Sequence, residues 1–391
     1  MKIDSPKEKK VCMVVLNDFT QDSRVLREAK TLREEGYQVF VLAIFSKGLP
    51  KEEKTEGAQV IRIFLKTKNL PKKKFFQIFK YIEFTIKSLI LILKEKPYVC
   101  HCHDLNTLPL GYLAKKILGS YLIYDSHELE SQRSTIKREP RWFRWLGRKL
   151  EHFLIKRVDG TIVVCDSIAD YIKKQDNIER PIVIRNIPDF QNNILNNGSG
   201  EHFGFSDEYK IIIYQGALLL NRGLEELIEA LKFLDKKIIL VIIGEGLLYE
   251  ELLRIVKKDN LRNRVIFKGY VPPAHLLKLT SQADVGIVPV KKITLSYYLA
   301  LPNKFFEYII AGLPVAVSDF PEMRKIVKNY KIGEIFNPES PKSIAEAIRK
   351  IFSNLQGYQR LKQNVKQARN YLNWEKERKK LLRIYEQFSE R

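Results

Sequence analysis

Short apolar runs alternate with amphipathic helix patterns along this chain, and the alternation occurs in two separate series. Continuous apolar runs predict strands buried on both faces, and helices between them predict a parallel sheet covered on both sides. The chain has 391 residues, too many for one hydrophobic core, so two α/β domains are expected. The expected strands are 11–16, 38–45, 60–65, 98–102, 121–124, 160–164 and 181–185, then 211–214, 238–243, 265–267, 285–288 and 315–317.

A polar stretch rich in Asn and Gly separates the two series, between residues 186 and 209. Such composition is typical of a linker or an exposed loop rather than of a packed element. We therefore expect a first Rossmann-like domain over 1–190, a linker or loop over 191–209, and a second Rossmann-like domain over 210–372. A Lys/Arg-rich amphipathic helix is expected in the last part, 373–391.

The charge of the chain indicates an anionic partner. Lys and Arg number 68 against 46 Asp and Glu, a net charge of +22, and residues 62–149 hold 19 basic and 7 acidic residues. A membrane surface, a nucleic acid or a polyanionic substrate would each fit this excess.

Cysteine usage and hydropathy predict a cytoplasmic protein. The four cysteines, Cys12, Cys100, Cys102 and Cys165, are scattered in apolar runs, which is typical of reduced, buried thiols. The charged start of the chain has no signal-peptide pattern, and the apolar stretch 88–93 is too short to span a bilayer. Peripheral contact with the inner face of the cell membrane stays compatible with this reading.

The segment LPNKFFEYIIAGLPVAVSD, residues 301–319, gives the strongest chemical signal. Lys304 and Glu307 lie on a predicted helix that ends at Gly312, and Pro314 opens the next strand. A carboxylate among aromatic and aliphatic neighbours needs a reason, because burying an unpaired charge is costly. At the carboxyl end of a parallel sheet it would hold ribose hydroxyls. The alternative is a residue that only solvates the helix.

Two further glycine-containing loops follow predicted strands of the second series. Gly216 follows one strand directly, which permits close approach of a ligand to the backbone, and Arg222 precedes a helix that begins near residue 224. A cation at such a position suits a pyrophosphate, although a surface Arg at a helix start is the commoner case. The turn with Gly244 and Gly246 is a weaker signal of the same kind.

In the first half, His103 and His127 each come directly after a strand, in HCHDLNTLP and YDSHELES. They should therefore lie at the same edge of the first sheet. A single His is more often structural than catalytic, but two at matching strand ends are more suggestive. Asp22 is expected to cap the helix that follows it. Zinc at 100–103 is rejected because alternate residues of a strand face opposite ways and no second cluster completes a tetrahedron.

Together these segments resemble the retaining glycosyltransferase family 4, which has the GT-B fold, over nearly the whole chain. The resemblance implies two Rossmann-like domains facing each other across a cleft, with the terminal helix packed back on the first. It implies that Glu307 binds ribose and Arg222 phosphate, and that His127 lies beside the reacting sugar. These three are the expected catalytic residues. The other implied donor contacts are Gly216, Gly244, Gly246, Gly269, Tyr270 and Lys304, and the implied acceptor-side residues are Arg24, His103 and Asp104.

Two positions depart from the family pattern. A second glutamate is often found eight residues before the one matching Glu307, and here that position is Leu299. A phosphate-binding Arg often follows the first Gly of the loop, and here Ala217 takes its place. Arg222 must therefore neutralise more of the donor charge, and Lys304 is a plausible substitute for the missing cation. The chain has no D-x-D pair, so neither a metal nor a cofactor is expected.

Two stretches of the first half, 71–96 and 141–157, are rich in both basic and aromatic residues. In 71–96 the apolar residues Phe75, Phe79, Ile82, Ile86 and Leu89 recur at helical spacing, and most are expected to face the core. Within the stretch 141–157, residues 141–149 mix two Trp and a Phe with arginines, which suits the headgroup region of an anionic membrane. The segments Lys72–Lys74 and Arg141–Lys149 are therefore the expected membrane contacts.

The resulting expectation is a retaining transferase that moves a sugar from a UDP- or GDP-linked donor to a saccharide or lipid-linked acceptor, in cell-surface polysaccharide or glycolipid synthesis. Two other classes stay open. One is a basic nucleic-acid- or membrane-binding protein, although no nucleic-acid module is visible and the aromatic residues lie on predicted helices. The other is a non-catalytic transferase scaffold, as the replacements at Leu299 and Ala217 would allow.

Overall fold

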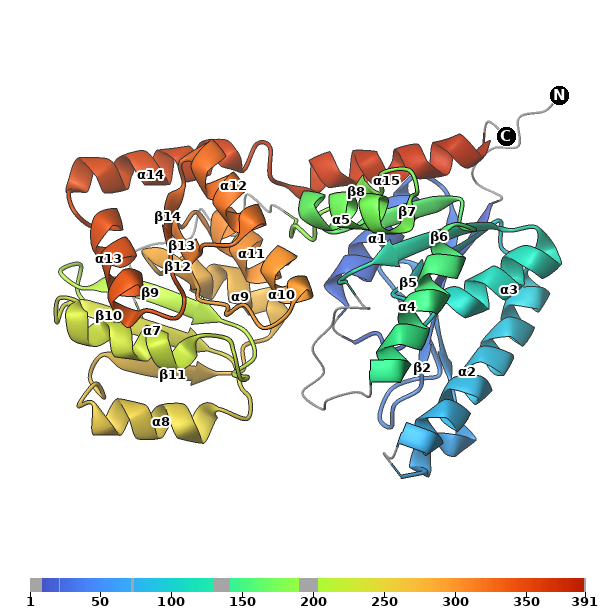
Figure 1. The fold of residues 1–391 in the computed structure, drawn as a ribbon, viewed down its shortest axis with the longest axis horizontal. Helices are drawn as coiled ribbons and strands as arrows, with labels where there is room; N and C mark the ends of the chain where they lie inside the picture. The colour runs from blue at the N-terminus through green and yellow to red at the C-terminus, as the bar shows by residue number, and fades with distance from the viewer. Residues whose placement is uncertain (1–8, 21, 72–73, 130–140, 190–202, 390–391) are drawn as a thin grey trace. The chain divides into compact units, whose positions relative to one another are not determined.

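The computed structural model describes residues 9–20, 22–71, 74–129, 141–189 and 203–389. The chain divides into two compact units, Met1–Arg185 with Arg378–Arg391 (unit 1) and Asn186–Glu377 (unit 2). Each unit is a parallel α/β domain built on its own sheet, as the alternation of apolar runs predicts (Figure 1). The segment expected as a linker falls largely outside the described residues, which resume at residue 203.

Unit 1 holds an eight-stranded sheet in the order β3-β4-β2-β1-β5-β6-β7-β8. All neighbours are parallel except β3 and β4, which form an antiparallel hairpin at one edge. Strand β3 has the charged sequence EEKT, which contains no apolar residue that would predict a strand. The strands are β1 (Lys10–Val14), β2 (Gln38–Ile44), β3 (Glu52–Thr55), β4 (Ala58–Ile63), β5 (Val99–His103), β6 (Tyr121–Ser126), β7 (Gly160–Val163) and β8 (Ile182–Val183).

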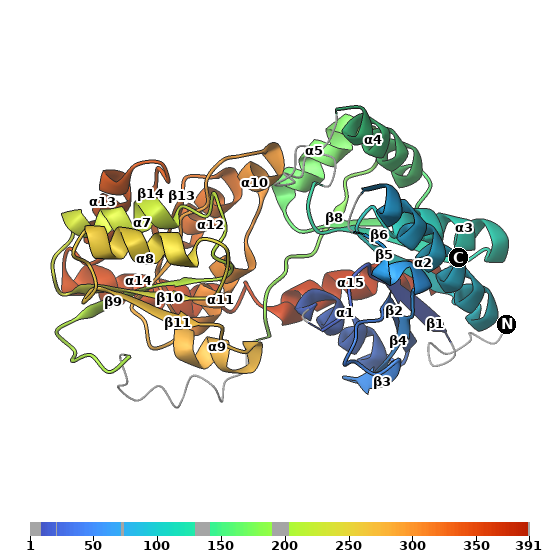
Figure 2. The same ribbon diagram turned by 90° about the horizontal axis from the view of Figure 1, so that it is seen from below.

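Helices cover both faces of this sheet (Figure 2). On one face, Gly111 of α3 packs so closely on Cys102 that an added Cβ would lie 2.3 Å from its Sγ. On the other face, Tyr385 of α15 bonds to His101 and packs against Tyr37. The helices of this unit are α1 (Ser23–Glu34), α2 (Lys74–Glu95), α3 (Leu108–Leu118), α4 (Arg141–Ile155), α5 (Asp166–Asp176) and α15 (Trp374–Ser389).

Helix α2 buries a different face from the expected one. Its buried residues include Phe84, Ser88 and Ile92, spaced four apart, whereas Phe79, Ile82 and Ile86 are exposed. The expectation that those three face the core is therefore wrong. Both stripes of this helix are apolar, so the spacing alone did not distinguish the face that packs on the sheet.

Unit 2 holds a six-stranded, wholly parallel sheet in the order β11-β10-β9-β12-β13-β14. The strand order reverses between β9 and β12, and ligands of such sheets bind at the carboxyl ends beside this reversal. The elements are β9 (Lys210–Gln215), α7 (Leu224–Ala230), β10 (Ile238–Ile243), α8 (Tyr249–Lys258), β11 (Val265–Gly269), α9 (Pro273–Thr280), β12 (Val285–Val288), α10 (Leu295–Leu299), α11 (Asn303–Ala311), β13 (Val315–Ser318), α12 (Pro321–Tyr330), β14 (Gly333–Phe336), α13 (Pro341–Ile351) and α14 (Leu355–Ala368).

Candidate active site

Lys304 and Gly216 meet at the carboxyl end of β9 in unit 2. Gly216 has φ +127, and a Cβ built on it would lie 3.0 Å from Nζ of Lys304. That ammonium also lies 3.7 Å from the centroid of the Tyr214 ring. A side chain at position 216 would therefore press on Lys304, so the glycine leaves room for a cation beside the strand end.

Glu307 lies three residues after Lys304 on α11, is half-buried, and accepts a hydrogen bond from Nε2 of Gln215. Gln215 is itself fixed, because its Oε1 accepts from Oγ1 of Thr280 at 2.7 Å and its backbone N–H donates to Oη of Tyr308 at 2.9 Å. Gln215, at the end of β9, thus fixes the orientation of the Glu307 carboxylate. Gln215 and Thr280 were not found from sequence, since only the tertiary fold joins them to Glu307.

Two cations share this corner of unit 2. The guanidinium of Arg222 lies 5.4 Å from the centroid of the Tyr297 ring. Burial and the charge of Arg222 hold the pKa of Lys304 well below its usual range, while Glu307 opposes that shift. A diphosphate placed here would supply the missing negative charge and favour the ammonium form.

The remaining donor-loop glycines have a packing role. A Cβ on Gly244 would lie 2.1 Å from the carbonyl oxygen of Gly216, and one on Gly246 would lie 2.3 Å from that of Leu218. The N–H of Gly244 donates to the carbonyl of Gly269 at 2.8 Å. Through these contacts the backbone of the loop with Gly244 and Gly246 packs on the loop with Gly216 and on the loop with Gly269. Tyr270 follows Gly269 and is exposed, and its contact with a base remains a prediction.

The two departures from the family pattern fall beside this group. Leu299 is buried at the end of α10. The carbonyl of Ala217 accepts a hydrogen bond of 3.1 Å from Oη of Tyr214. Neither position offers a charged side chain, so the donor charge falls to other basic groups such as Arg222 and Lys304.

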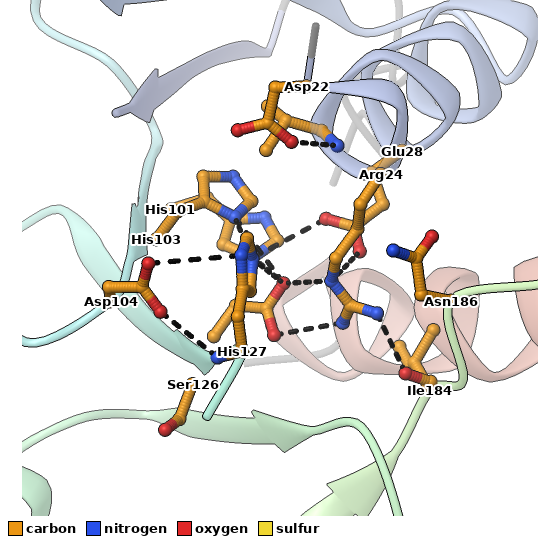
Figure 3. A network of polar contacts seen from close by, with 12 residues as sticks. Asp22, Arg24, Glu28, His101, His103, Asp104, Ser126, His127, Ile184 and Asn186 are labelled. Carbon is orange, nitrogen blue, oxygen red and sulfur yellow. Dashed lines mark hydrogen bonds and ion pairs between the residues drawn. The ribbon is translucent and has the colours of Figure 1, made fainter. Parts of the chain in front are cut away.

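Unit 1 carries a buried charged cluster at the ends of β5 and β6 (Figure 3). The rings of His101 and His103 stack on one face of β5 with centroids 4.4 Å apart. Cys102 faces α3 on the opposite side, and all four cysteines are free and buried. The cysteine and histidine side chains of 100–103 therefore do not converge on one point, as the alternation of a strand predicts. His103 is only 3% exposed, and its expected place on the acceptor side stays a prediction.

Arg24 is also buried. Its guanidinium donates to both carboxylate oxygens of Asp125 at 2.9 Å and to the carbonyl of Ile184 at 2.8 Å. Its Nε lies 3.2 Å from Oε1 of Glu28, one turn along α1. Each nitrogen of the guanidinium thus donates inside unit 1, and the acceptor-side role of Arg24 stays a prediction. Asp22 caps α1, as expected, by accepting from Val25.

His127 lies between two carboxylates. Its Nε2 is 3.3 Å from Oδ2 of Asp125 and its Nδ1 is 3.9 Å from Oδ2 of Asp104. Burial lowers its pKa, but the charges of Asp125 and Asp104 outweigh burial and raise the pKa to about 9. The backbone N–H of His127 donates to Oδ1 of Asp104 at 3.1 Å, and Asp104 holds a left-handed φ of +65. Both carboxylates therefore favour the protonated, imidazolium form of the ring.

Four buried residues could together hold a metal ion. Ligand atoms of Glu28, His101, His103 and Asp125 all lie within 4.8 Å of one another. However, Arg24 already pairs with both carboxylates, and burial raises the pKa of Glu28 to about 7. The guanidinium and a proton on Glu28 thus supply the positive charge that a metal would bring, and we assign no metal role to the cluster.

Comparison with known proteins is consistent with both halves of this description. Residues 22–190 match the family model described as "Glycosyltransferase Family 4", and residues 200–368 match "Glycosyl transferases group 1". An uncharacterized glycosyltransferase of Methanocaldococcus jannaschii is 32% identical over 39% of this chain and 38% of its own length. A chitobiosyldiphosphodolichol beta-mannosyltransferase of Candida albicans is 26% identical over 54% of this chain and 49% of its own. The matches thus span half or less of these curated relatives.

Solved structures match over almost the whole chain. Sucrose-phosphate synthase of Thermosynechococcus elongatus superposes with a TM-score of 0.81 at 19% identity, covering 97% of this chain and 98% of that one. Anabaena HepE in complex with UDP gives a TM-score of 0.73 at 16% identity and covers 98% of each chain. These likenesses show the fold, and the family models show the family. The chain belongs to the group 1 glycosyltransferases of family 4, with the GT-B fold.

Proposed function

We propose that this protein transfers a sugar from a UDP- or GDP-linked donor to a saccharide or lipid-linked acceptor, with retention of configuration. The observation that carries the proposal is the grouping of Lys304, Arg222 and Glu307 around the carboxyl end of β9. Glu307 would accept hydrogen bonds from the ribose hydroxyls, and the two cations would bind the diphosphate. Structures of the similar Anabaena HepE contain UDP and UDP-glucose, which supports this ligand class.

In such a transfer the leaving group is the nucleoside diphosphate, which carries the negative charge. As the glycosyl bond breaks, negative charge accumulates on the diphosphate, and cations already in place stabilise it without rearranging. Arg222 and Lys304 would do this from unit 2 without a metal. The imidazolium of His127 in unit 1 would donate a hydrogen bond to the reacting sugar or the departing diphosphate.

A nucleotide panel tests the donor site. We expect UDP or GDP to raise the melting temperature of unit 2, since a ligand at 100 times its Kd adds about 2.7 kcal/mol of stability. Arg222→Ala should raise the Kd at least about 10-fold, because it removes a charge-assisted contact with phosphate. Arg254→Ala, on α8 of the same unit, is the control. Stabilisation by DNA, with none by any nucleotide or nucleotide sugar, would favour the nucleic-acid alternative instead.

Unit 1 also exposes an apolar surface that supports a lipid-linked acceptor. On α2, Ile78, Ile82, Ile86 and Ile90 form an exposed row spaced four apart. Helix α2 packs on α3, and α3 on α4, where further large side chains are exposed. They are Leu113, Ile117, Trp142, Trp145, Leu146, Leu150 and Phe153. We propose that this surface, the α2–α4 face, contacts an anionic membrane. Lys72 and Lys73 lie outside the described residues, as do the side chains of Lys74, Arg141 and Arg144.

Liposome flotation tests the membrane proposal. The protein should float with vesicles that contain anionic phosphatidylserine or phosphatidylglycerol, because basic residues near such a surface contribute about 1 kcal/mol each and exposed Trp side chains insert at the headgroups. Trp142→Ala with Trp145→Ala should lower the floated fraction at least about threefold. Leu355→Ala, which removes an exposed apolar side chain of unit 2, should leave it unchanged. Equal recovery of all three proteins in the bottom fraction would refute the membrane contact.

A further inference from the structure

Asp125 is the residue of the buried cluster that connects it to His127. Its carboxylate is fully buried, while the His127 side chain is 22% exposed, and the two are joined by the 3.3 Å contact between Oδ2 and Nε2. Asp125 therefore touches no molecule outside the protein. Whatever it contributes to a reaction must pass through the imidazole ring of His127.

The carboxylate of Asp125 has little freedom to turn. Arg24 donates to both of its oxygens through Nε and one terminal nitrogen, and the other terminal nitrogen donates to the carbonyl of Ile184. Paired hydrogen bonds between a guanidinium and a carboxylate fix the plane of both groups. Arg24 on α1 and Ile184 after β8 thus fix the direction in which the Asp125 carboxylate faces His127.

The other ring nitrogen of His127, Nδ1, lies toward the partly exposed side chain of Asp104. Asp104, whose side chain is 30% exposed, lies 3.9 Å from Nδ1, beyond hydrogen-bond distance. Thr107 holds Asp104 in place by donating to its carbonyl oxygen at 3.1 Å. Nε2 of His127 lies 3.3 Å from both Oδ2 of Asp125 and Nδ1 of His103, so the Nδ1–H group is the donor that remains for a ligand.

We propose that Asp125 is a positioning residue for sugar transfer: held by Arg24, it orients the ring of His127 and keeps it doubly protonated, so that Nδ1–H donates to a sugar hydroxyl or a diphosphate oxygen. This inference rests on the proposed function, because sugar transfer is the reaction in which the His127 ring would act. Asp104 supports the same protonation state from the side of Nδ1.

The groups that face His127 decide how its protonation depends on pH. They are Asp125 of β6, His103 at the end of β5, Asp104 after it, and Arg24 and Glu28 of α1. The pKa of Asp125 lies well below its usual range, because Arg24 and His127 outweigh its burial. Asp125 therefore remains charged throughout the neutral range and keeps the pKa of His127 high.

Asp125→Asn in the full-length protein keeps the shape of the side chain at position 125 and removes its negative charge. Without the carboxylate, the pKa of His127 should fall from about 9 toward its ordinary value of about 6.5. At pH 8 the protonated fraction would then drop about 30-fold, and kcat should fall by a similar factor while the KM for the donor changes little. At pH 5.5 the loss should be small, since both proteins then carry the imidazolium.

The ring itself can be observed without any substrate. Nitrogen-15 NMR of the histidine side chains, with His127→Gln to assign the signal, should show the titration midpoint of His127 moving down in Asp125→Asn. Asp104→Asn provides a second variant that should fold, because Asn tolerates the left-handed backbone of this position, and it should lower the midpoint by less. Glu95→Gln, which removes a surface ion pair of the same unit, is the control with unchanged activity.

The outcomes separate the two proposals. An unchanged His127 midpoint in both Asp variants, or a loss of activity in Asp125→Asn that is equal at pH 5.5 and pH 8, would overturn the positioning role. Stoichiometric metal in the purified protein that Asp125→Asn loses would also overturn it, since the carboxylate of Asp125 would then bind a metal and not serve His127. A shifted midpoint in a protein that turns over no nucleotide sugar would contradict the proposed function and leave the ring assignment standing.

Discussion

Replacing Glu307 with Ala is expected to abolish measurable sugar transfer while the protein stays folded. The carboxylate is aimed by Gln215 at the end of β9, where it would accept hydrogen bonds from both ribose hydroxyls. Hydrogen bonds to a charged group contribute about 1.5–3 kcal/mol each, so losing two should lower kcat/KM by at least about 10²- to 10³-fold. Glu307 is half-buried, so the variant should stay folded, with a melting temperature lowered only by the lost contact with the buried Gln215.

Steady-state kinetics with the donor identified by the nucleotide panel provide the measurement. Glu346→Ala, which removes an exposed carboxylate on α13 of the same unit, is the matched control and should retain full activity. Circular dichroism of each protein would establish that the fold is kept. Transfer at the wild-type rate by a folded Glu307→Ala protein would refute the assignment of the donor site.

Arg24→Ala should have the largest effect on stability. Arg24 and Asp125 are both buried, and removing one partner leaves the other charge uncompensated, which costs about 3–5 kcal/mol. For a domain of this size that corresponds to a melting temperature lower by on the order of 10 °C. Calorimetry would measure it, and hydrogen exchange at β5 and β6 would place the loss in unit 1.

A matched surface pair separates this effect from general charge removal. Arg180→Ala breaks the exposed ion pairs with Asp166 and Asp170, which should contribute at most about 1 kcal/mol. Combining Arg24→Ala with Asp125→Ala should cost less than the sum of the two single changes, because the double variant leaves no unpaired charge of that pair. A melting temperature unchanged by Arg24→Ala would show that the buried pair does not stabilise unit 1.

Most of the fold follows from the apolar runs. Strands such as β10, with the sequence IILVII, are buried along their whole length, and few other structures accommodate such a segment. The hairpin strand β3 could not be predicted in this way, because an edge strand of charged residues is stabilised by its partner β4 and not by burial. The buried face of α2 was predicted wrongly for a related reason, since both of its stripes are apolar.

The candidate site was predictable to very different extents in the two units. Lys304 and Glu307 are three residues apart on one helix, so their placement on one face follows from sequence. The partnership of Asp125 with Arg24 joins residues 101 positions apart, and no local pattern contains it. One signal was present: Glu28 lies three residues after Val25 and four before Leu32, within the apolar stripe of α1. A carboxylate in such a stripe indicates a buried partner.

The position of α15 has a consequence for how the protein is made. Its residue Phe388 stacks on Tyr121, Tyr385 bonds to His101, and Ile384 lies against Gly160, so the helix closes one face of the unit 1 sheet. Ribosomes add about 5–20 residues per second, and domains usually fold as they emerge. Here the part of that face that α15 covers stays exposed until the whole of unit 2 has been translated, although α1 already packs on the same face. Nascent chains stalled before residue 374 should therefore be strong clients of chaperones.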